Sequence, residues 1–334
     1  MPNLITITTL ILGFIIYILS LYKSEVFANY FGLIDKPNKF KIHSNPTPLV
    51  GILPIFSMFS FFFLSNLATN FQLDYLLIFI TTTVFFLIGI IDDKTNLNAY
   101  FKLFLSTSIL ILFLYFSKDL KLEFLYSETF DKGLNLNNSI LSIFFTVLCI
   151  LLLTNSLNLS DGINSLASGI STIWLFVLTI LVNDQIKIYL LALTILMILN
   201  TYFIYKGKFF LGDSGTLFLG SFVSLLTVLI YNKYLNINIT ISVEKIFMFF
   251  IVPGIDMLRL FIVRIINFKD PFKGDLNHLH HYLLKYFSLN TTLIIYWGLV
   301  ISNIILAYKL QDYLYLAILF NLILYCSFLI FWKI

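Results

Sequence analysis

The chain alternates between long apolar runs and short polar segments. The runs include TLILGFIIYILSLY at residues 9–22 and MFFIVPGIDMLRLFIVRII at residues 248–266. A stretch of about 20 apolar residues crosses the hydrocarbon core of a bilayer as one helix. The pattern predicts an all-α, polytopic integral membrane protein of a single domain, residues 1–334, with about eleven transmembrane helices. They are expected near residues 4–22, 48–66, 75–91, 100–117, 140–156, 167–183, 187–205, 215–232, 245–266, 291–308 and 313–331.

Composition agrees with this pattern, because 59% of the residues are hydrophobic and only 11% are charged. The first run is not expected to be a signal peptide, because no small-residue cleavage site follows it. The two cysteines, Cys149 and Cys326, lie in apolar runs, where a thiol behaves as a small hydrophobic group. They predict neither a disulfide nor a metal site.

The distribution of Lys and Arg orients the predicted helices. If residues 23–47 face the cytoplasm, that side carries more Lys and Arg in its loops than the other side. The amino terminus is therefore predicted to lie on the outer side of the membrane. The acids of the outer side show no pattern and are interpreted as solvated loop charges: Asp74, Asp119, Glu123, Glu128, Asp131, Asp184, Glu244 and Asp312.

The cytoplasmic acids, in contrast, recur beside Gly, Asn and His. They lie in IDDKTNL, NSLNLSDGIN, FFLGDSG and KDPFKGDLNHLHH, and all four histidines share this face. The adjacent Asp92 and Asp93 could mark a solvated helix end. Adjacent carboxylates, however, raise each other's pKa unless a cation neutralises them, and a hard metal ion such as magnesium takes oxygen ligands.

Two further segments carry polar residues at a membrane edge. Asn155, Asn158 and Asp161 are spaced three apart, which on a helix makes a polar stripe. Helix capping would explain Asp161, but polar amides just inside a membrane segment favour a ligand that faces them. Asp213, between Gly212 and Ser214, fits either a capped turn or a phosphate site at a helix start.

The HLHH segment could bind zinc through its imidazoles. Only two of His278, His280 and His281 are expected to converge from one helix, since neighbouring residues do not share a helix face. A complete zinc shell is therefore disfavoured, and donation to pyrophosphate oxygens is the preferred interpretation.

Taken together, five segments resemble one family. They are DKPNKFKIHSNPTP, IDDKTNLNAYFKL, NSLNLSDGINSLASG, FFLGDSGT and PGIDMLRLFIVRIINFKDPFKGDLNHLHHYLL. They are similar to the polyprenyl-phosphate N-acetylhexosamine-1-phosphate transferases of glycosyltransferase family 4, which begin bacterial cell-envelope polysaccharides. The HLHH ending resembles the N-acetylglucosamine and O-antigen branch more than the muramoyl-pentapeptide branch.

The resemblance implies a magnesium-dependent transfer of a sugar-1-phosphate from a UDP-amino sugar to undecaprenyl phosphate, with UMP released. Manganese is the alternative metal. UDP-N-acetylglucosamine is the expected donor, with N-acetylfucosamine, N-acetylquinovosamine and diacetylbacillosamine donors as alternatives. The implied partners are these substrates and membrane lipids, not nucleic acid, and a homodimer is left open.

The resemblance also implies roles for individual residues. Asp213 would be the principal magnesium ligand, completed by Asp92 or Asp93, and Asp93 or its neighbour would serve as base or nucleophile. The remaining contacts would be to the substrates: Asp161 and Asn158 to ribose and phosphate, Asn164 to the nucleotide, Phe210 stacked on uracil, and Lys41, His278, His280 and His281 to phosphate oxygens.

The chain departs from the family pattern in its third segment. It reads DGINSL where the family usually has DGIDGL, so that Asn164 replaces a carboxylate and Ser165 replaces a glycine. An Asn that usually precedes FFLGD is also displaced, with Asn200 as the nearest candidate. A transporter would instead carry its ionisable residues near the bilayer midplane. Only Asp256 and Arg259 fit that description, and a structural ion pair is expected between them.

Overall fold

The computed structural model describes residues 4–35, 46–136, 138–182, 184, 186–236, 241–272 and 277–331. Its helices are α1 (Leu4–Phe31), α2 (Leu53–Thr69), α3 (Leu73–Thr95), α4 (Ala99–Tyr115), α5 (Ser139–Leu159), α6 (Leu166–Leu181), α7 (Lys187–Tyr205), α8 (Gly212–Asn236), α9 (Val243–Ile266), α10 (Leu279–Tyr286), α11 (Leu289–Lys309) and α12 (Leu314–Phe331). A short 3-10 helix, η1, covers Gln311–Tyr313. Each predicted span overlaps one of the long helices. The predicted start at residue 48 is wrong, because α2 begins at Leu53 and Pro48 belongs to strand β2.

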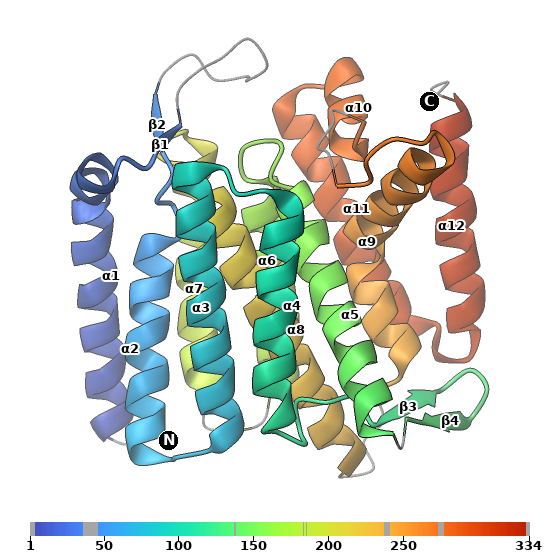
Figure 1. Ribbon diagram of the computed structural model, residues 1–334, viewed down its shortest axis with the longest axis horizontal. Coiled ribbons are helices and arrows are strands. Elements are labelled where there is room, and N and C mark those ends of the chain that lie inside the picture. The colour runs from blue at the N-terminus through green and yellow to red at the C-terminus, as the bar shows by residue number, and fades with distance from the viewer. Residues whose placement is uncertain are drawn as a thin grey trace.

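The long helices stand side by side and alternate in direction (Figure 1). One end of the bundle, here called the motif end, holds the carboxyl ends of α3 and α5, the start of α8, and α10 (Figure 1). The other end, the opposite end, holds the start of α1. The four described motif segments therefore share one end of the molecule, as predicted.

Seven of the helices are long and apolar enough to cross a membrane, and the shorter apolar helices are α2, α4, α6 and α12. The chain is thus a multi-pass helical membrane protein. The predicted end of the first helix near residue 22 is wrong, because α1 continues to Phe31. No Gly or Pro occurs between residue 22 and Gly32, whose φ of 71° is the left-handed conformation in which helices commonly end.

Helix α8 lies at the centre of the bundle and packs against α3, α5 and α6. Two glycines bring its neighbours close. A Cβ on Gly89 of α3 would lie 2.3 Å from the Ser214 Cα, and one on Gly220 would lie 2.8 Å from the Thr154 Cα of α5. Because neither position has room for a side chain, the start of α8 lies directly against the end of α3, and its middle lies directly against α5.

Two small antiparallel hairpins supplement the helices, which the all-α prediction did not include. Strands β1 (Ile34–Asp35) and β2 (Thr47–Pro48) pair at the motif end. Strands β3 (Phe124–Ser127) and β4 (Lys132–Asn135) pair at the opposite end (Figure 1).

The acids of the opposite end are not all solvated, contrary to the sequence-based interpretation. Glu128 lies 2.6 Å from the ammonium of Lys245, which is buried at the start of α9. Asp184 forms an ion pair with Lys233 and accepts a hydrogen bond from the Tyr75 hydroxyl at 2.9 Å. The β3–β4 hairpin and the α6–α7 connection bring these charges against helix ends, which hydropathy along the chain does not reveal.

Candidate active site

Asp92 lies at the end of α3, where the chain turns sharply into α4. Asn96 ends α3 in the left-handed conformation, with φ of 51°, and the next backbone N–H, from Leu97, donates to Asp92 Oδ1 at 2.7 Å. Asp92 Oδ2 accepts from the ammonium of Lys102, on α4, at 2.6 Å. Asp92 is therefore a buried carboxylate held by its own turn and by one cation.

Asp213 begins α8 and meets the same cation. Its Oδ2 lies 3.1 Å from Lys102 Nζ, and its Oδ1 accepts from the Asn158 side-chain amide at 2.7 Å. The Lys102 ammonium thus bridges two carboxylates from different helices. The sequence-based assignment of the site omitted Lys102. The available signal was its position in IDDKTNLNAYFKL, one helix turn into α4 after the Asn98 cap.

Asp93 has a different environment from its neighbour. Its Oδ1 accepts the backbone N–H of Asp213 at 2.8 Å, and its Oδ2 accepts that of Ser214 at 3.0 Å. A carboxylate at this position complements the first N–H groups and the dipole of α8. Gly212 permits the contact, because its φ is 71° and a Cβ there would lie 2.8 Å from Asp93 Oδ2. Both oxygens of Asp93 therefore hold the start of α8.

Asp161 lies in the loop between α5 and α6 and is half-buried. Burial raises the pKa of its carboxyl well above the usual range, and the nearby carboxylates of Asp213 and Asp93 raise it further. The predicted stripe is only partly realised. Asn158 faces α8, whereas Asn155 donates its amide back to the Leu151 carbonyl of its own helix at 2.7 Å.

The three imidazoles of HLHH lie together, although only two of them, His280 and His281, come from helix α10. The expectation that neighbouring residues would not meet is wrong for this pair. The ring centroids are 4.2 Å apart for His280 and His281 and 5.5 Å apart for His278 and His280. Helical spacing does not apply to His278, because α10 begins only at Leu279.

His280 is fully buried, and neither ring nitrogen has a hydrogen-bond partner in the described part of the protein. It faces Gly162, where a Cβ would lie 2.4 Å from His280 Nε2 and 3.0 Å from His281 Nε2. The histidines therefore pack directly on the loop that carries Asp161. An imidazole with two unpaired nitrogens can hydrogen-bond an incoming polar group.

The expected ion pair of α9 is confirmed, with Arg259 Nη2 3.2 Å from Asp256 Oδ1. The pair also extends toward the histidines. Asp256 Oδ2 lies 2.8 Å from His278 Nδ1, and Asp256 Oδ1 accepts the Leu279 N–H at 3.1 Å. The buried carboxylate of Asp256 therefore fixes the His278 ring through its Nδ1 atom.

The other predicted substrate contacts lie at the rim or outside the described residues. Lys41 falls within 36–45, which the structure does not describe. The Phe210 backbone pairs with Pro48 and Gly51, while Asn164 is half-buried beside the Asp161 loop. Asn200 is fully buried and donates to the Gly51 carbonyl at 2.7 Å, so it supports the loop before α2.

Ser165 adopts φ of 69° at the start of α6. This left-handed conformation is strained for a residue with a Cβ and explains why a glycine would be favoured there. Its hydroxyl donates to the Thr201 carbonyl at 3.0 Å, which offsets part of the strain.

The metal-binding capacity of the site is limited to a few oxygens. No group of three or more His, Cys, Asp or Glu that could hold a metal occurs among the described residues. The carboxylates of Asp92 and Asp213 nevertheless lie close together, because both contact the Lys102 ammonium. Magnesium typically takes one or two carboxylates and completes its shell with water and substrate phosphates, so this donor set fits such an ion.

The fold and site thus define a polytopic helical membrane protein with an acidic, histidine-lined centre at one end. A family model described as Glycosyl transferase family 4 matches residues 75–231, which contain all of the site's aspartates except Asp256. The chain belongs to this family, as its similarity to curated relatives also shows.

Several of these relatives are bacterial transferases. The chain is 30% identical over 267 residues to a probable undecaprenyl-phosphate N-acetylglucosaminyl 1-phosphate transferase of Bacillus subtilis, covering 76% of this chain and 70% of that protein. It is 24% identical to the undecaprenyl-phosphate α-N-acetylglucosaminyl 1-phosphate transferase of Yersinia pestis, with 85% and 78% covered. A phospho-N-acetylmuramoyl-pentapeptide-transferase of Dictyoglomus thermophilum is 29% identical, with 54% and 59% covered.

Proposed function

We propose that this protein transfers N-acetylglucosamine-1-phosphate from UDP-N-acetylglucosamine to undecaprenyl phosphate and releases UMP. The observation that carries the proposal is the meeting of Asp92 and Asp213 on the single ammonium of Lys102. Such an arrangement suits phosphoryl transfer, which depends mainly on positioning and on neutralising phosphate charge. The names of the relatives supply the donor sugar and the acceptor lipid.

The family is a class of membrane phosphosugar transferases that generally depend on a metal. In our proposal the metal is magnesium, held by Asp213 and Asp92, and when bound it supplies positive charge to the donor diphosphate. Asn158 fixes the rotamer of Asp213 through its 2.7 Å hydrogen bond. Lys102, His280 and His281 then donate to phosphate oxygens, and His280 gains the partner that it otherwise lacks.

We favour direct attack by the lipid phosphate. One of its anionic oxygens bonds to the β-phosphorus of the donor, and the bond from that phosphorus to the UMP oxygen breaks. Asp93 is a poor candidate for nucleophile, because both of its oxygens accept N–H groups of α8. Its proposed role is to hold Asp213 in place. Asp161 and Asn164 are left to contact the nucleotide, with Phe210 against uracil.

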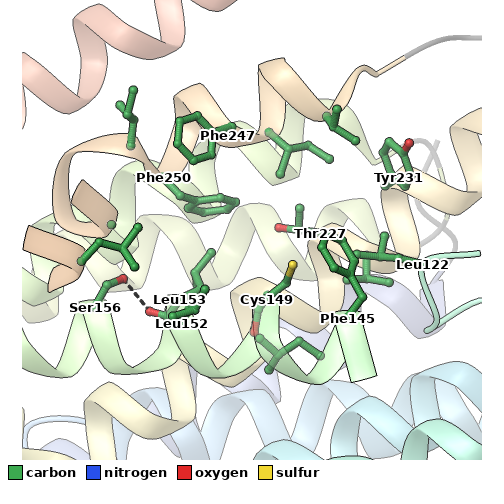
Figure 2. A pocket seen from close by; sticks show the side chains of 18 of the residues that line it. Leu122, Phe145, Cys149, Leu152, Leu153, Ser156, Thr227, Tyr231, Phe247 and Phe250 are labelled. Atoms are coloured by element: carbon green, nitrogen blue, oxygen red, sulfur yellow. Dashed lines mark hydrogen bonds between the residues drawn. The ribbon is translucent and has the colours of Figure 1, made fainter. Parts of the chain in front are cut away.

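An apolar cavity of about 350 Å³ lies between α5, α8 and α9 (Figure 2). Its lining includes Phe145, Cys149 and Phe250, and its partly exposed members Phe247 and Leu152 open it toward lipid. Such a surface suits a segment of a polyprenyl chain. We propose that it holds the acceptor, since α5 leads from this cavity to Asn158 at the motif end.

The proposed orientation places the motif end in the cytoplasm of a bacterial cell, with the protein in the inner membrane and its amino terminus in the periplasm. The charge bias between loops supports it. Single cysteines introduced at Ser44, Ser214 and Asn277 should resist a membrane-impermeant reagent applied from outside. Rapid labelling of any one of them in intact cells would overturn this orientation.

The reaction is tested with purified protein, undecaprenyl phosphate, magnesium and a panel of UDP-sugars. UMP should appear only when all components are present, fastest with UDP-N-acetylglucosamine, and chelation of magnesium should stop it. Labelled UMP should not exchange into the donor when the lipid is absent. Exchange under those conditions would contradict direct attack, and failure to release UMP from any donor would contradict the proposed function.

A further inference from the structure

A buried carboxylate outside the proposed reaction centre contacts the histidine segment. Asp256, on α9, is 3% exposed. A carboxylate at this depth is unfavourable unless it is paired and hydrogen-bonded. Its partners come from three helices: His278 and the Leu279 N–H at the start of α10, Arg259 one turn along α9, and the Tyr325 hydroxyl of α12.

The contacts form a closed network. Arg259 Nε donates to the Tyr325 hydroxyl at 3.0 Å, and Arg259 Nη2 also donates to the Asn277 carbonyl. The side chain of His278, at the N-cap position of α10, makes no capping hydrogen bond. Asp256 instead accepts the first N–H of that helix, so a residue of α9 caps α10 from outside.

The same contact defines the state of the His278 ring. An ionised carboxylate can only accept, so Nδ1 must carry the proton in this contact, and Nε2 lies on the opposite side of the ring. The His278 ring lies nearly parallel to that of His280, at 8°, and His280 packs on Gly162. A displacement of His278 is therefore passed to the loop that carries Asp161.

We infer that Asp256 is a positioning residue that sets the tautomer of His278 and presses the histidine segment against the Asp161–Gly162 loop, with Arg259 and Tyr325 completing its support. Helix α12 thereby supports the part of the site that we propose binds the UDP-sugar, through the contact of Tyr325 with Asp256. The inference rests on the proposed function only for its kinetic readout.

The kinetic experiment compares Asp256→Asn, His278→Gln and the double variant in the UMP-release assay. Asp256→Asn should lower kcat/KM for the UDP-sugar by about tenfold to a hundredfold, the range found when the carboxylate behind a metal-bound histidine is removed. The Michaelis constant for lipid phosphate should not change. In the His278→Gln background the same substitution should have less than about a twofold effect, because a residue that acts through another is not additive with it.

Two further variants keep the comparison interpretable. Tyr325→Phe retains the ring and removes one donor, so it should produce a smaller loss of the same kind even if Asp256→Asn folds poorly. Asp184→Asn is the matched control, because it also removes a carboxylate bonded to a Tyr hydroxyl and a cation, but at the opposite end. Its kinetics should equal those of the unaltered protein. Additive losses from Asp256→Asn and His278→Gln would overturn the inference.

A spectroscopic readout separates this inference from the proposed reaction. In ¹⁵N-histidine NMR spectra, His278 should appear as the Nδ1-protonated tautomer, identified by its absence in His278→Gln, and this signal should shift in Asp256→Asn. An unchanged His278 signal in Asp256→Asn would refute the positioning role even if the protein released UMP. The shift would support that role even if no UDP-sugar reacted.

Discussion

Asp161 and Asp184 are loop carboxylates at opposite ends of the bundle, and their surroundings shift their pKa values in opposite directions. Burial would raise the pKa of Asp184, but its hydrogen bonds from Lys233 and Tyr75 outweigh this and lower the pKa below its usual value. For Asp161, burial raises the pKa, and the carboxylates of Asp213 and Asp93 raise it further. One carboxylate has a cation of its own, and the other lies among like charges.

The same contrast holds for the lysines of the two ends. Lys245 pairs with Glu128 alone among the described residues, whereas Lys102 serves both Asp92 and Asp213. Lys245 and Glu128 therefore balance each other, whereas the cluster of Asp92, Asp213 and Lys102 holds two carboxylates for one ammonium. An excess of this kind disfavours the fold unless a cation and its ligands neutralise it, which is typical of functional sites.

The largest expected effect is that of Asp213→Asn. The amide keeps the hydrogen bond to Asn158 possible but removes the charge that would hold a metal, so kcat/KM should fall at least about a thousandfold. The control Asp184→Asn should retain full activity. UMP release across a magnesium titration measures both. A normal magnesium dependence in Asp213→Asn would place the metal elsewhere.

Replacing the two lysines should separate activity from stability. Lys102→Met should lower kcat/KM by about a hundredfold. It should also lower the Tm, and added magnesium should restore the Tm, because Asp92 and Asp213 then repel each other without a cation.

Lys245→Met should instead keep its specific activity and lose about 3 kcal/mol of stability, because it leaves Glu128 partly buried without its cation. Thermal unfolding in detergent, with and without magnesium, measures the difference. Equal responses of both variants to magnesium would remove the distinction between the two ends.

Neutralising the two loop aspartates should shift stability in opposite directions at pH 7. Asp161→Asn should raise the Tm by a few degrees while lowering activity, because a carboxyl whose folded pKa is raised destabilises the fold once it ionises. Asp184→Asn should lower the Tm, because a carboxyl with a lowered folded pKa stabilises the fold above its unfolded pKa of about 3.9.

Both differences should diminish as the pH falls. The Asp184 contribution is lost as the pH falls through the lowered folded pKa. The Asp161 penalty fades as the pH falls through its raised folded pKa and is absent once the pH is below the unfolded value. Unfolding scans between pH 7 and about pH 2 test this, because the Asp184 difference should persist down to the unfolded pKa of about 3.9 and be lost only below it. A Tm difference of the same sign for both variants at pH 7 would contradict the comparison.

The smallest expected effect concerns Ser165. Ser165→Ala removes the hydrogen bond to Thr201 and keeps the strained backbone, so it should cost about 1 kcal/mol. Ser165→Gly loses the same bond but relieves the left-handed conformation, so it should be more stable than Ser165→Ala by a few tenths of a kcal/mol or more. A Tm for Ser165→Ala equal to or above that of Ser165→Gly would show that the backbone is not strained there.

Much of the site was predictable because its residues are local in sequence. Asp92, Asp213 and Asn158 were assigned to one centre from their motifs, and the structure brings them together around Lys102. Lys102 itself was missed, because a lone lysine in a loop-to-helix segment has the same appearance as a solvated charge. Convergence of the histidines was underestimated, because the start of α10 is not evident from the sequence.

The sequence by itself determined which segments form long apolar helices, since hydropathy over about 20 residues is a local property. It also determined which polar segments lie at one end, because helices that alternate in direction distribute their loops in turn. Only the tertiary structure decided that Asp93 holds α8 while Asp92 faces Lys102, and that Asp256 supports His278. Those outcomes depend on the close approach of α8 to Gly89 of α3 and of the α10 histidines to Gly162 in the α5–α6 loop, between residues far apart in the chain, which no local pattern encodes.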